Sequence, residues 1–476
     1  MYMRIDGKEV AAANETWLDV INPATGKVLD QVPAGSGSDA SAAVESAEAA
    51  FGAWSKKTTR ERGLILYRAA ELVRHHHQAL GRQLTLEQGK PLREAIDEVR
   101  GCANILEYYA AIAGKPAGEA IHLGSAGDCL VTREPLGVCA AIIPWNMPVI
   151  IMGWKTGPAL LAGNTLVLKP ASRTPLTTLK IAALLQDAGV PPGVLNVVTG
   201  AGETVGAALV THPLVQKISF TGDCSTGHQI RAMAARQNKE ITLELGGSDP
   251  MIVMEDADID RAVDGAIRGR FYNAGQTCTA VKRLYLHEKI ATEFTKKLLA
   301  RTEALRVGDG LLPGTDIGPM TGREQLARIS AQVEVVKEKE EGTVLCGGCA
   351  LRGNDYERGF FYQPTLITDV APGTSLVTDE IFGPVLPVMT IPDLDAAIAE
   401  ANRSRYGLGA SIWTKDIGTV NRVFRDVRAG IIWVNRHLIV PPEVPFGGVN
   451  ESGIGRENGY HALESYSRSK TLFLGW

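Results

Sequence analysis

The chain of 476 residues is 45% hydrophobic and 21% charged, with a formal net charge of -4. These values are typical of an ordinary globular protein and exclude strong electrostatic attraction to nucleic acid or to an anionic membrane surface, so small molecules are the expected partners. Because a single hydrophobic core stops growing at roughly 250–300 residues, the length predicts two large domains.

The N-terminal part is expected to be strands followed by helices. Short strands and turns are predicted in residues 1–35, where NPATG supplies turn residues. Apolar residues spaced i, i+3, i+4 then predict helices at Ala40–Trp54, Thr59–Leu80 and Pro91–Ala113. His75, His76 and His77 fall on the second of these helices, where neighbouring side chains point about 100° apart, so a solvated helix face is expected there rather than a shared metal.

Strands alternate with helices through the rest of the chain. After a hairpin that includes Leu130–Val138, strands are predicted at 138–143, 165–170, 194–200, 216–222 and 240–245. A second series has strands at 251–254, 283–287 and near 364, 385, 409 and 430, with helices at 259–272, 288–306 and 322–341. This rhythm predicts an α/β protein with a doubly wound parallel sheet and a second α/β domain, the two meeting near Gly246–Pro250.

The segment FYNAGQTCTAVKR at 271–283 places Cys278 among small and polar residues. A structural cysteine usually lies in an apolar run, whereas a nucleophile needs a polar and accessible setting that favours the thiolate. Upstream, Glu244 ends a predicted strand and precedes a Gly-Gly pair, which permits close backbone approach. The two residues form a candidate nucleophile and base.

Two glycine-containing turns follow predicted strands, at Gly200–Gly206 and Phe220–Asp223. A turn from strand to helix can hold a phosphate through backbone N–H groups and the helix dipole, although the first turn departs from GxGxxG spacing and an ordinary turn is the alternative. Asn146 lies between two prolines in IPWNMP at 143–148. Its amide either donates to an oxyanion or only caps a loop.

The seven cysteines are an odd and scattered set, which does not fit a secreted disulfide framework. The chain also lacks an apolar leader and any apolar stretch of about 20 residues, so a cytoplasmic protein without a membrane partner is expected. Cys346 and Cys349 form a CxxC pair, but one pair does not complete a four-ligand zinc site. No metal is expected.

Seven ordered motifs resemble the aldehyde dehydrogenase superfamily, and they extend over nearly the whole chain: PWNMP (144–148), AGNTLVLKPAS (162–172), FTG (220–222), LELGG (243–247), GQTC (275–278), EIFGPV (380–385) and PFGGVNESGIGRE (445–457). The resemblance implies a Rossmann-like dinucleotide-binding domain at 1–114 and 136–246 and a catalytic domain at 247–447. It also implies a small β oligomerisation element at 115–135 and 458–476, and hence a homodimer or homotetramer.

The resemblance implies a role for each motif residue. Cys278 is expected to attack a small-molecule aldehyde, Asn146 and the Cys278 backbone N–H to hold the oxyanion, and Glu244 to activate the water that releases the acid. Lys169 is expected to meet the adenosine ribose and Glu380 the nicotinamide ribose. The expected cofactor-binding residues are Ile143, Pro144, Trp145, Lys169, Ser172, Gly202, Phe220, Gly222, Leu245, Glu380 and Phe382. The implied reaction passes through a thiohemiacetal and a thioester, and a general base favours hydrolysis over transfer to coenzyme A.

Two positions depart from the common pattern of the superfamily. Ser172 stands where many NAD-preferring members carry a glutamate that binds the ribose 2'-hydroxyl. With Lys169 and Arg173 nearby, we expect NADP to be accepted or preferred, the alternative being that a small neutral residue admits both NADP and NAD. Asp223 follows FTG where serine is common, and it either points away from the cofactor or caps the next helix.

The expected substrate is an apolar aliphatic or aromatic aldehyde, because Trp154 and Tyr272 stand where succinate-semialdehyde dehydrogenases carry arginines. The expected pocket residues are Met147, Trp154, Tyr272, Val440 and Phe446. One alternative is a semialdehyde or hydroxyaldehyde whose polar head binds Arg436 and His437. Others are a catalytically idle family member and, without the resemblance, a cysteine-dependent acyl-transfer enzyme with a nucleotide domain.

Overall fold

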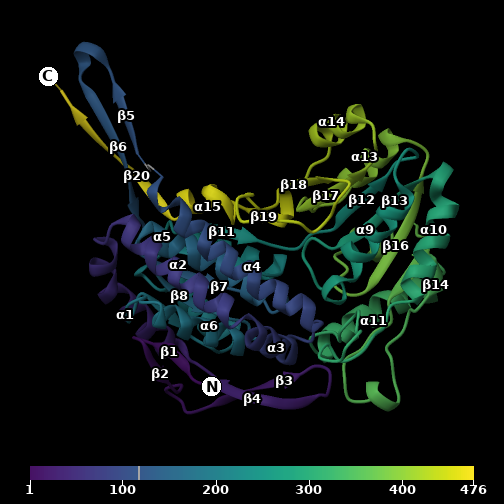
Figure 1. The fold of residues 1–476 in the computed structure, drawn as a ribbon, viewed down its shortest axis with the longest axis horizontal. Helices are drawn as coiled ribbons and strands as arrows, with labels where there is room; N and C mark the ends of the chain where they lie inside the picture. Colours follow the sequence, from purple (N-terminus) through teal and green to yellow (C-terminus); the bar gives the residue numbers. More distant parts are fainter. Residues whose placement is uncertain (116–117, 372, 476) are drawn as a thin grey trace.

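The computed structural model describes residues 1–115, 118–371 and 373–475, and it has the predicted α/β fold. Two sheets lie in two lobes, and a narrow arm projects from the first lobe (Figure 1). Residues 116, 117 and 476 of the predicted oligomerisation element, and residue 372 of the predicted catalytic domain, lie outside the described residues.

The first sheet has eight strands, and five adjacent strands among them run parallel to one another. Its central strands are buried on both faces, which is why they appear in the sequence as continuous apolar runs. In spatial order the strands are β19 (Gly453–Ile454), β11 (Glu240–Glu244), β10 (Val215–Thr221), β7 (Val138–Ile142), β8 (Thr165–Lys169), β9 (Leu195–Val197), β1 (Met3–Ile5) and β2 (Lys8–Val10).

Helices cover both faces of the first sheet (Figure 1). The predicted helix at 59–80 is wrong in one respect, because the chain forms two helices that meet at His76, where the backbone leaves the helical region. His75 and His77 therefore belong to different helices. The helices of this lobe are α1 (Gly37–Ser55), α2 (Thr59–His75), α3 (His77–Gln88), α4 (Leu92–Ala111), α5 (Pro148–Ala162), α6 (Leu176–Asp187), α7 (Ala207–Thr211) and α8 (Cys224–Ala235).

The second sheet has seven strands, all parallel to their neighbours except β14. In spatial order they are β14 (Thr343–Cys346), β15 (Thr365–Thr368), β16 (Val385–Ile391), β13 (Val281–His287), β12 (Asp249–Val253), β17 (Gly409–Trp413) and β18 (Ile431–Val434). The helices of this lobe are α9 (Ile259–Phe271), α10 (Glu288–Glu303), α11 (Arg323–Glu338), α12 (Ser375–Thr378), α13 (Leu394–Asn402) and α14 (Ile417–Asp426).

The arm is a three-stranded antiparallel sheet in the order β20 (Ser467–Leu474), β6 (Asp128–Pro135) and β5 (Glu119–His122). The predicted hairpin at Leu130–Val138 is shifted, because β6 ends at Pro135 and Val138 already belongs to β7. Gly137, with a φ of 127°, lies between these two strands. Helix α15 (Gly459–Ser465) leads into the arm, and a separate hairpin, β3 (Trp17–Asn22) and β4 (Lys27–Pro33), lies near the N-terminus (Figure 1).

No helix in the described part of the chain is long and apolar enough to cross a membrane.

Candidate active site

The first sheet changes its direction of winding between β7 and β10. The chain proceeds from β7 to β8 to β9 on one side, and then returns to place β10 and β11 on the other side of β7. In open parallel sheets, ligands bind in the crevice outside the carboxyl ends of the strands at such a switch point. A cavity of about 510 Å³ lies there, lined by residues that end or follow β7, β8, β10 and β11.

All of the predicted cofactor residues line this cavity, together with Asn146 and Cys278. Most belong to the first lobe, whereas Glu380 and Phe382 come from the loop between α12 and β16 of the second. The Phe382 ring meets the Trp145 ring edge to face, with centroids 5.4 Å apart. The cavity is therefore bounded by both lobes, and its size and lining fit a nucleotide.

The region expected to bind the adenosine ribose carries positive and neutral side chains. Lys169 is buried, and burial lowers the pKa of its ammonium group to about 8. The Ser172 hydroxyl donates to the Gly200 carbonyl at 3.0 Å. Arg173, which also lines the cavity, pairs with Glu324 and Gln325 and is held at its rim by these contacts.

The two glycine-containing turns both border the cavity, but they differ in form. Gly202–Gly206 is a π-helical turn that leads into the short helix α7, so only Gly202 of this turn lines the cavity. Asp223 caps α8, because its carboxylate accepts from the Thr226 N–H at 2.9 Å and from the Thr226 hydroxyl at 2.7 Å. This cap accounts for a carboxylate at the turn, because the Thr226 N–H and hydroxyl already engage it.

Cys278 lies between α9 and β13, after a turn of strained backbone. Asn273 and Ala274 have positive φ values of 51° and 54° within the short helix Tyr272–Gly275. Burial raises the pKa of the Cys278 thiol to about 12, and the nearby Lys282 ammonium opposes that rise. The cysteine is partly buried and lines the cavity, so it remains accessible from that side.

Asn146 is anchored at three points. Its backbone carbonyl accepts from the Lys90 ammonium at 2.8 Å and from the side-chain amide of Asn273 at 2.9 Å. Its own side-chain amide nitrogen donates to the backbone carbonyl of Gln276 at 3.0 Å. The second N–H of the amide is engaged by no described residue. Asn146 is thus joined to the loop that carries Cys278 and has one N–H free to donate.

Glu244 ends β11 and is buried, and neither carboxylate oxygen has a hydrogen-bond partner among the described residues. Burial raises the pKa of Glu244 well above its ordinary value, with the Glu457 carboxylate adding to the effect and Lys155 and Arg456 opposing it. A carboxyl group held this way is an effective base near neutral pH once it loses its proton.

The Gly-Gly pair after Glu244 has the role expected from its sequence. A Cβ at Gly246 would lie 2.4 Å from Glu380 Oε2, and one at Gly247 would lie 2.9 Å from the Cys278 carbonyl oxygen. Larger residues would therefore separate the end of β11 from both Glu380 and Cys278.

Sequence reasoning missed a buried ionic network next to Glu244. The ammonium of Lys155 pairs with Glu457 and donates to the Ser219 hydroxyl at 2.9 Å, and that hydroxyl donates to Glu457 at 2.8 Å. The sequence does contain one sign of this network, because Lys155 lies in the middle of α5, which is otherwise an apolar, buried helix.

Four of the five predicted pocket residues belong to the same hydrophobic core as Cys278. Trp154 and Phe446 are buried with ring centroids 4.9 Å apart, and Met147 and Val440 pack, partly buried, against the same hydrophobic core as Cys278. Tyr272 instead lines a separate hollow of about 420 Å³ with the acidic residues Glu94 and Asp97.

The alternative polar-head site is not supported for His437. Its Nε2–H donates to the Thr279 carbonyl at 2.7 Å, which leaves Nδ1 to accept from the Ser411 hydroxyl at 3.0 Å. Burial lowers the pKa of His437 to about 4, so the ring is neutral at neutral pH. Both nitrogens are occupied, and the ring offers no charge to an anion. Arg436 is exposed.

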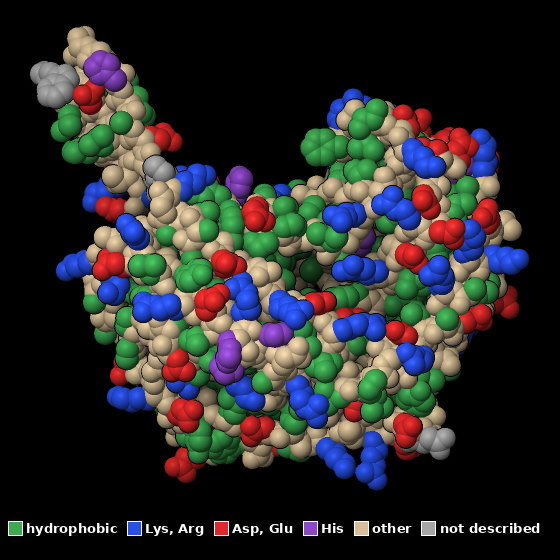
Figure 2. Space-filling model, viewed as in Figure 1, with side chains coloured by type: hydrophobic (Ala, Val, Ile, Leu, Met, Phe, Trp, Pro, Cys, Tyr) green, Lys and Arg blue, Asp and Glu red, His purple; other side chains and the backbone are tan. Residues whose placement is uncertain are grey.

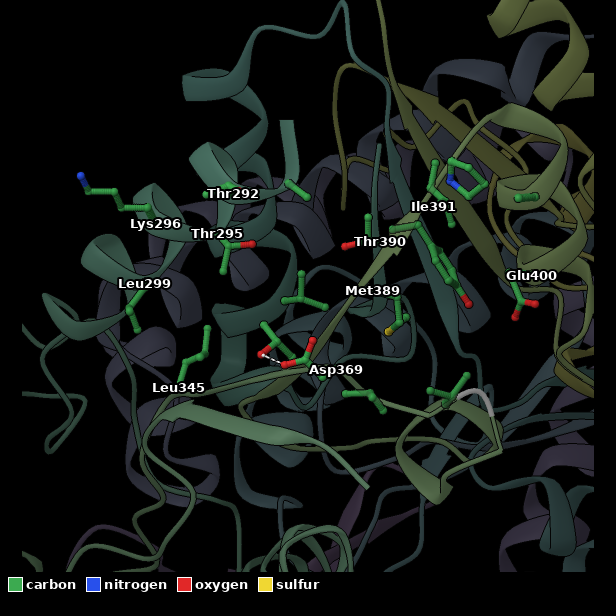
Figure 3. A pocket seen from close by; sticks show the side chains of 18 residues that line it. Thr292, Thr295, Lys296, Leu299, Leu345, Asp369, Met389, Thr390, Ile391 and Glu400 are labelled. Atoms are coloured by element: carbon green, nitrogen blue, oxygen red, sulfur yellow. Dashed lines mark hydrogen bonds between the residues drawn. The ribbon is translucent and has the colours of Figure 1, made fainter. Parts of the chain in front are cut away.

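A larger hollow of about 660 Å³ lies in the second lobe between α10 and β16 (Figure 3). Its lining contains none of the predicted site residues, and the Thr368 hydroxyl there simply donates to its neighbour Asp369 at 3.2 Å. The described residues contain no group of three His, Cys, Asp or Glu side chains that could hold a metal. Cys346 and Cys349 are free thiols at the end of β14, away from the cavity.

Comparison with known proteins decides the family. A model of the aldehyde dehydrogenase family matches residues 10–472. This chain belongs to the aldehyde dehydrogenase family. As in its relatives, the activity is NAD(P)-dependent oxidation of an aldehyde.

Among similar aldehyde dehydrogenases, the betaine aldehyde dehydrogenase of Rhizobium leguminosarum bv. trifolii is 42% identical over 475 residues, which covers 99% of this chain and 96% of the relative. An Escherichia coli enzyme described as NADP dependent has 40% identity and a TM-score of 0.97, covering 100% of this chain and 98% of that one. A Staphylococcus aureus betaine aldehyde dehydrogenase solved with NAD+ has 36% identity and a TM-score of 0.97, covering 100% of this chain and 94% of that one.

Proposed function

We propose that Cys278 is the nucleophile of this aldehyde dehydrogenase, with Asn146 as oxyanion donor and Glu244 as the base for hydrolysis. The observation that carries the proposal is that Cys278 and Asn146 share one cavity with every residue assigned to the cofactor, while Glu244 lies close enough for its charge to act on the thiol. We also propose that the chain divides into a dinucleotide-binding domain at 1–114 and 136–246, a catalytic domain at 247–447 and an oligomerisation element at 115–135 and 458–476.

The first half of the reaction forms a covalent bond to the enzyme. The Cys278 sulfur adds to the aldehyde carbonyl, and the resulting oxyanion is stabilised by the Asn146 amide and the Cys278 N–H. Glu380 and Phe382 line the cavity and would hold the nicotinamide of a bound cofactor, which would supply the hydride acceptor needed to convert the adduct on Cys278 into a thioester. Trp145 and Phe382 narrow the cavity around the reacting groups and exclude bulk water.

The second half hydrolyses the thioester. Glu244 takes a proton from water, the hydroxide equivalent attacks the thioester carbonyl, and the Cys278 sulfur leaves as the carboxylic acid is released. The unpartnered carboxylate oxygens of Glu244 favour this role, because a structural glutamate in a buried site normally accepts protein hydrogen bonds. A buried general base is also what separates this enzyme from acyl-transferring relatives and from an inactive binding protein.

We propose that the cofactor is NADP or NAD, with NADP at least accepted. Ser172 brings no negative charge against a 2'-phosphate, and the cationic side chains of Lys169, Arg173 and Arg328 line the same cavity. Its relatives are mixed in this respect, since one is described as NADP dependent and another was solved with NAD+.

Replacing Ser172 with glutamate is expected to lower kcat/KM for NADP by about tenfold or more and to leave kcat/KM for NAD nearly unchanged, because a carboxylate repels a 2'-phosphate but can bind a 2'-hydroxyl. Steady-state kinetics with both cofactors measures this, and S172A is the matched control that adds no charge. An equal effect of S172E on both cofactors would refute the assignment of this position.

We propose an apolar aliphatic or aromatic aldehyde as the substrate, since Trp154, Phe446, Met147 and Val440 are apolar and pack in the same hydrophobic core as Cys278. Betaine aldehyde is the second candidate. The names of the similar enzymes point to it, and paired aromatic rings can bind a quaternary ammonium group by cation–π interaction.

In a panel of aldehydes, kcat/KM for hexanal or benzaldehyde is expected to exceed that for succinate semialdehyde by at least about tenfold, because Trp154, which packs against Phe446, offers no positive charge to a distal carboxylate. Absorbance of the reduced nicotinamide measures each rate, and betaine aldehyde is included to separate the two candidates. Preference for succinate semialdehyde would contradict the proposal, and the absence of any aldehyde-dependent reduction would contradict the function itself.

We further propose a cytoplasmic homodimer or homotetramer. The arm presents exposed apolar side chains (Figure 2), among them Leu130, Leu472 and Phe473, and each of its two outer strands pairs with only one strand in the described part of the chain. The second sheet ends at β18, and Phe424 of α14 in the same lobe is exposed. Open edges and apolar patches of this kind favour pairing with another copy, and sedimentation equilibrium would distinguish dimer from tetramer.

A further inference from the structure

Lys282 is a fully buried lysine in β13 that contacts the backbone of the nucleophile. Its ammonium donates to the Cys278 carbonyl at 2.5 Å and to Glu380 Oε1 at 2.9 Å. The buried ammonium therefore joins two parts of the site that are distant in sequence.

Glu380 is fixed in place by these contacts. Its Oε1 also accepts from the Gly247 N–H at 3.0 Å, and its side chain lines the cofactor cavity. The Lys282 ammonium lies 5.6 Å from the centroid of the Phe382 ring, within the range of a cation–π interaction. Glu380 and Phe382, the two second-lobe residues assigned to the nicotinamide end of the cofactor, therefore both interact with the Lys282 ammonium.

The charges around Cys278 come from four elements. Glu244 ends β11, Asp249 begins β12, Glu380 follows α12, and Lys282 lies in β13. Burial raises the pKa of Cys278 most, the three carboxylates raise it further, and Lys282 lowers it. Lys282 is the one cation among these four groups, and its charge opposes the effect of the three carboxylates on the thiol.

We propose that Lys282 is a positioning residue that holds the Glu380 carboxylate against the Cys278 peptide and places a buried positive charge beside the nucleophile. The first part rests on the proposed role of Glu380 in binding the cofactor, whereas the second needs neither cofactor nor aldehyde. The side chain touches the machinery without contacting a reacting atom, which distinguishes it from Cys278, Glu244 and Asn146.

The test uses the full-length enzyme and alkylation of Cys278 by iodoacetamide at fixed pH, without cofactor. Lys282→Met is expected to slow alkylation about tenfold, since a rise of one pKa unit lowers the thiolate fraction tenfold. Glu380→Gln removes a carboxylate and is expected to accelerate alkylation. A structural disturbance alone would not give changes of opposite sign.

Steady-state kinetics tests the positioning role. Lys282→Met is expected to raise the cofactor KM about tenfold, and adding Lys282→Met to Glu380→Gln is expected to raise it little further, because both act through one carboxylate. Lys217→Met is the matched control: Lys217 is an equally buried lysine of β10 that donates to the Thr242 hydroxyl at 2.8 Å, outside the cavity lining. Its alkylation rate and cofactor KM should match the wild type.

The proposal would be overturned if Lys282→Met had the alkylation rate and the cofactor KM of the wild type. It would also be overturned if Lys282→Met and Glu380→Gln changed the alkylation rate in the same direction. If Lys282→Met does not fold, Glu380→Gln still decides, because unchanged or slower alkylation of that variant contradicts the charge balance. Failure of the proposed reaction would appear separately, as absence of aldehyde-dependent cofactor reduction by the wild type, while the alkylation rates remain measurable.

Discussion

Replacing Cys278 with alanine is expected to lower kcat for aldehyde oxidation by about four orders of magnitude or more. Cys278 is the one thiol among the described residues that line the cofactor cavity, and the covalent route has no substitute for its sulfur. Without covalent addition, no tetrahedral thiohemiacetal forms from which hydride can leave. The measurement is the steady-state rate of nicotinamide reduction with saturating aldehyde.

Cofactor binding separates loss of chemistry from loss of structure in this experiment. The Cys278→Ala variant is expected to bind NADPH with wild-type affinity, measured by the fluorescence of the reduced nicotinamide. Cys224→Ala is the matched control, because Cys224 is a partly buried thiol of α8 whose sulfur contacts the Glu451 carbonyl at 3.3 Å outside the cavity lining. Substantial turnover by Cys278→Ala would exclude the cysteine mechanism.

Replacing Glu244 with glutamine is expected to lower the steady-state rate by about 10²- to 10⁴-fold while the first turnover survives. The amide has nearly the size of the carboxyl group but cannot take a proton from water, so the thioester would accumulate. Rapid-mixing absorbance should then show a burst of about one reduced nicotinamide per active site, followed by a slow phase. A variant that loses the burst as well would place Glu244 in the first half of the reaction.

The pH dependence of deacylation provides a second check on Glu244. Burial raises its pKa well above that of an ordinary glutamate, and only the deprotonated form accepts a proton from water. The deacylation rate of the wild type is therefore expected to rise with pH through this raised pKa and to level off above it. In Glu244→Gln this rise should disappear, whereas a profile that persists in the variant would belong to another group.

The residues predicted to bind the cofactor line one cavity, and most of them end or follow a strand of the first sheet. Parallel strands buried on both faces form apolar runs that are visible in the sequence, and the residues that follow them necessarily meet at one edge of the sheet. The predicted α/β fold is confirmed, and Trp145, Phe220 and Leu245 line one cavity for this reason. Asp223 capping α8 was one of two roles that its sequence position allowed.

Other parts of the site could not be read from local sequence. Lys155 and Glu457 are 302 positions apart, and Lys282 and Glu380 are 98 apart, so neither pair has a periodic signal. The helix break at His76 has no glycine or proline to mark it. The neutrality of His437 follows from Thr279 and Ser411, which are neighbours only in the folded chain.

Strand β19 joins the edge of the first sheet beside β11, although the whole second sheet lies between them in the chain. Closing so long a loop is entropically costly, so contacts of this kind are expected to form late in folding. Glu457 follows β19, and it reaches Lys155 only when this strand is in place. A folding intermediate with two formed sheets would therefore already have most of its cofactor cavity, while the surroundings that tune Glu244 would be completed last.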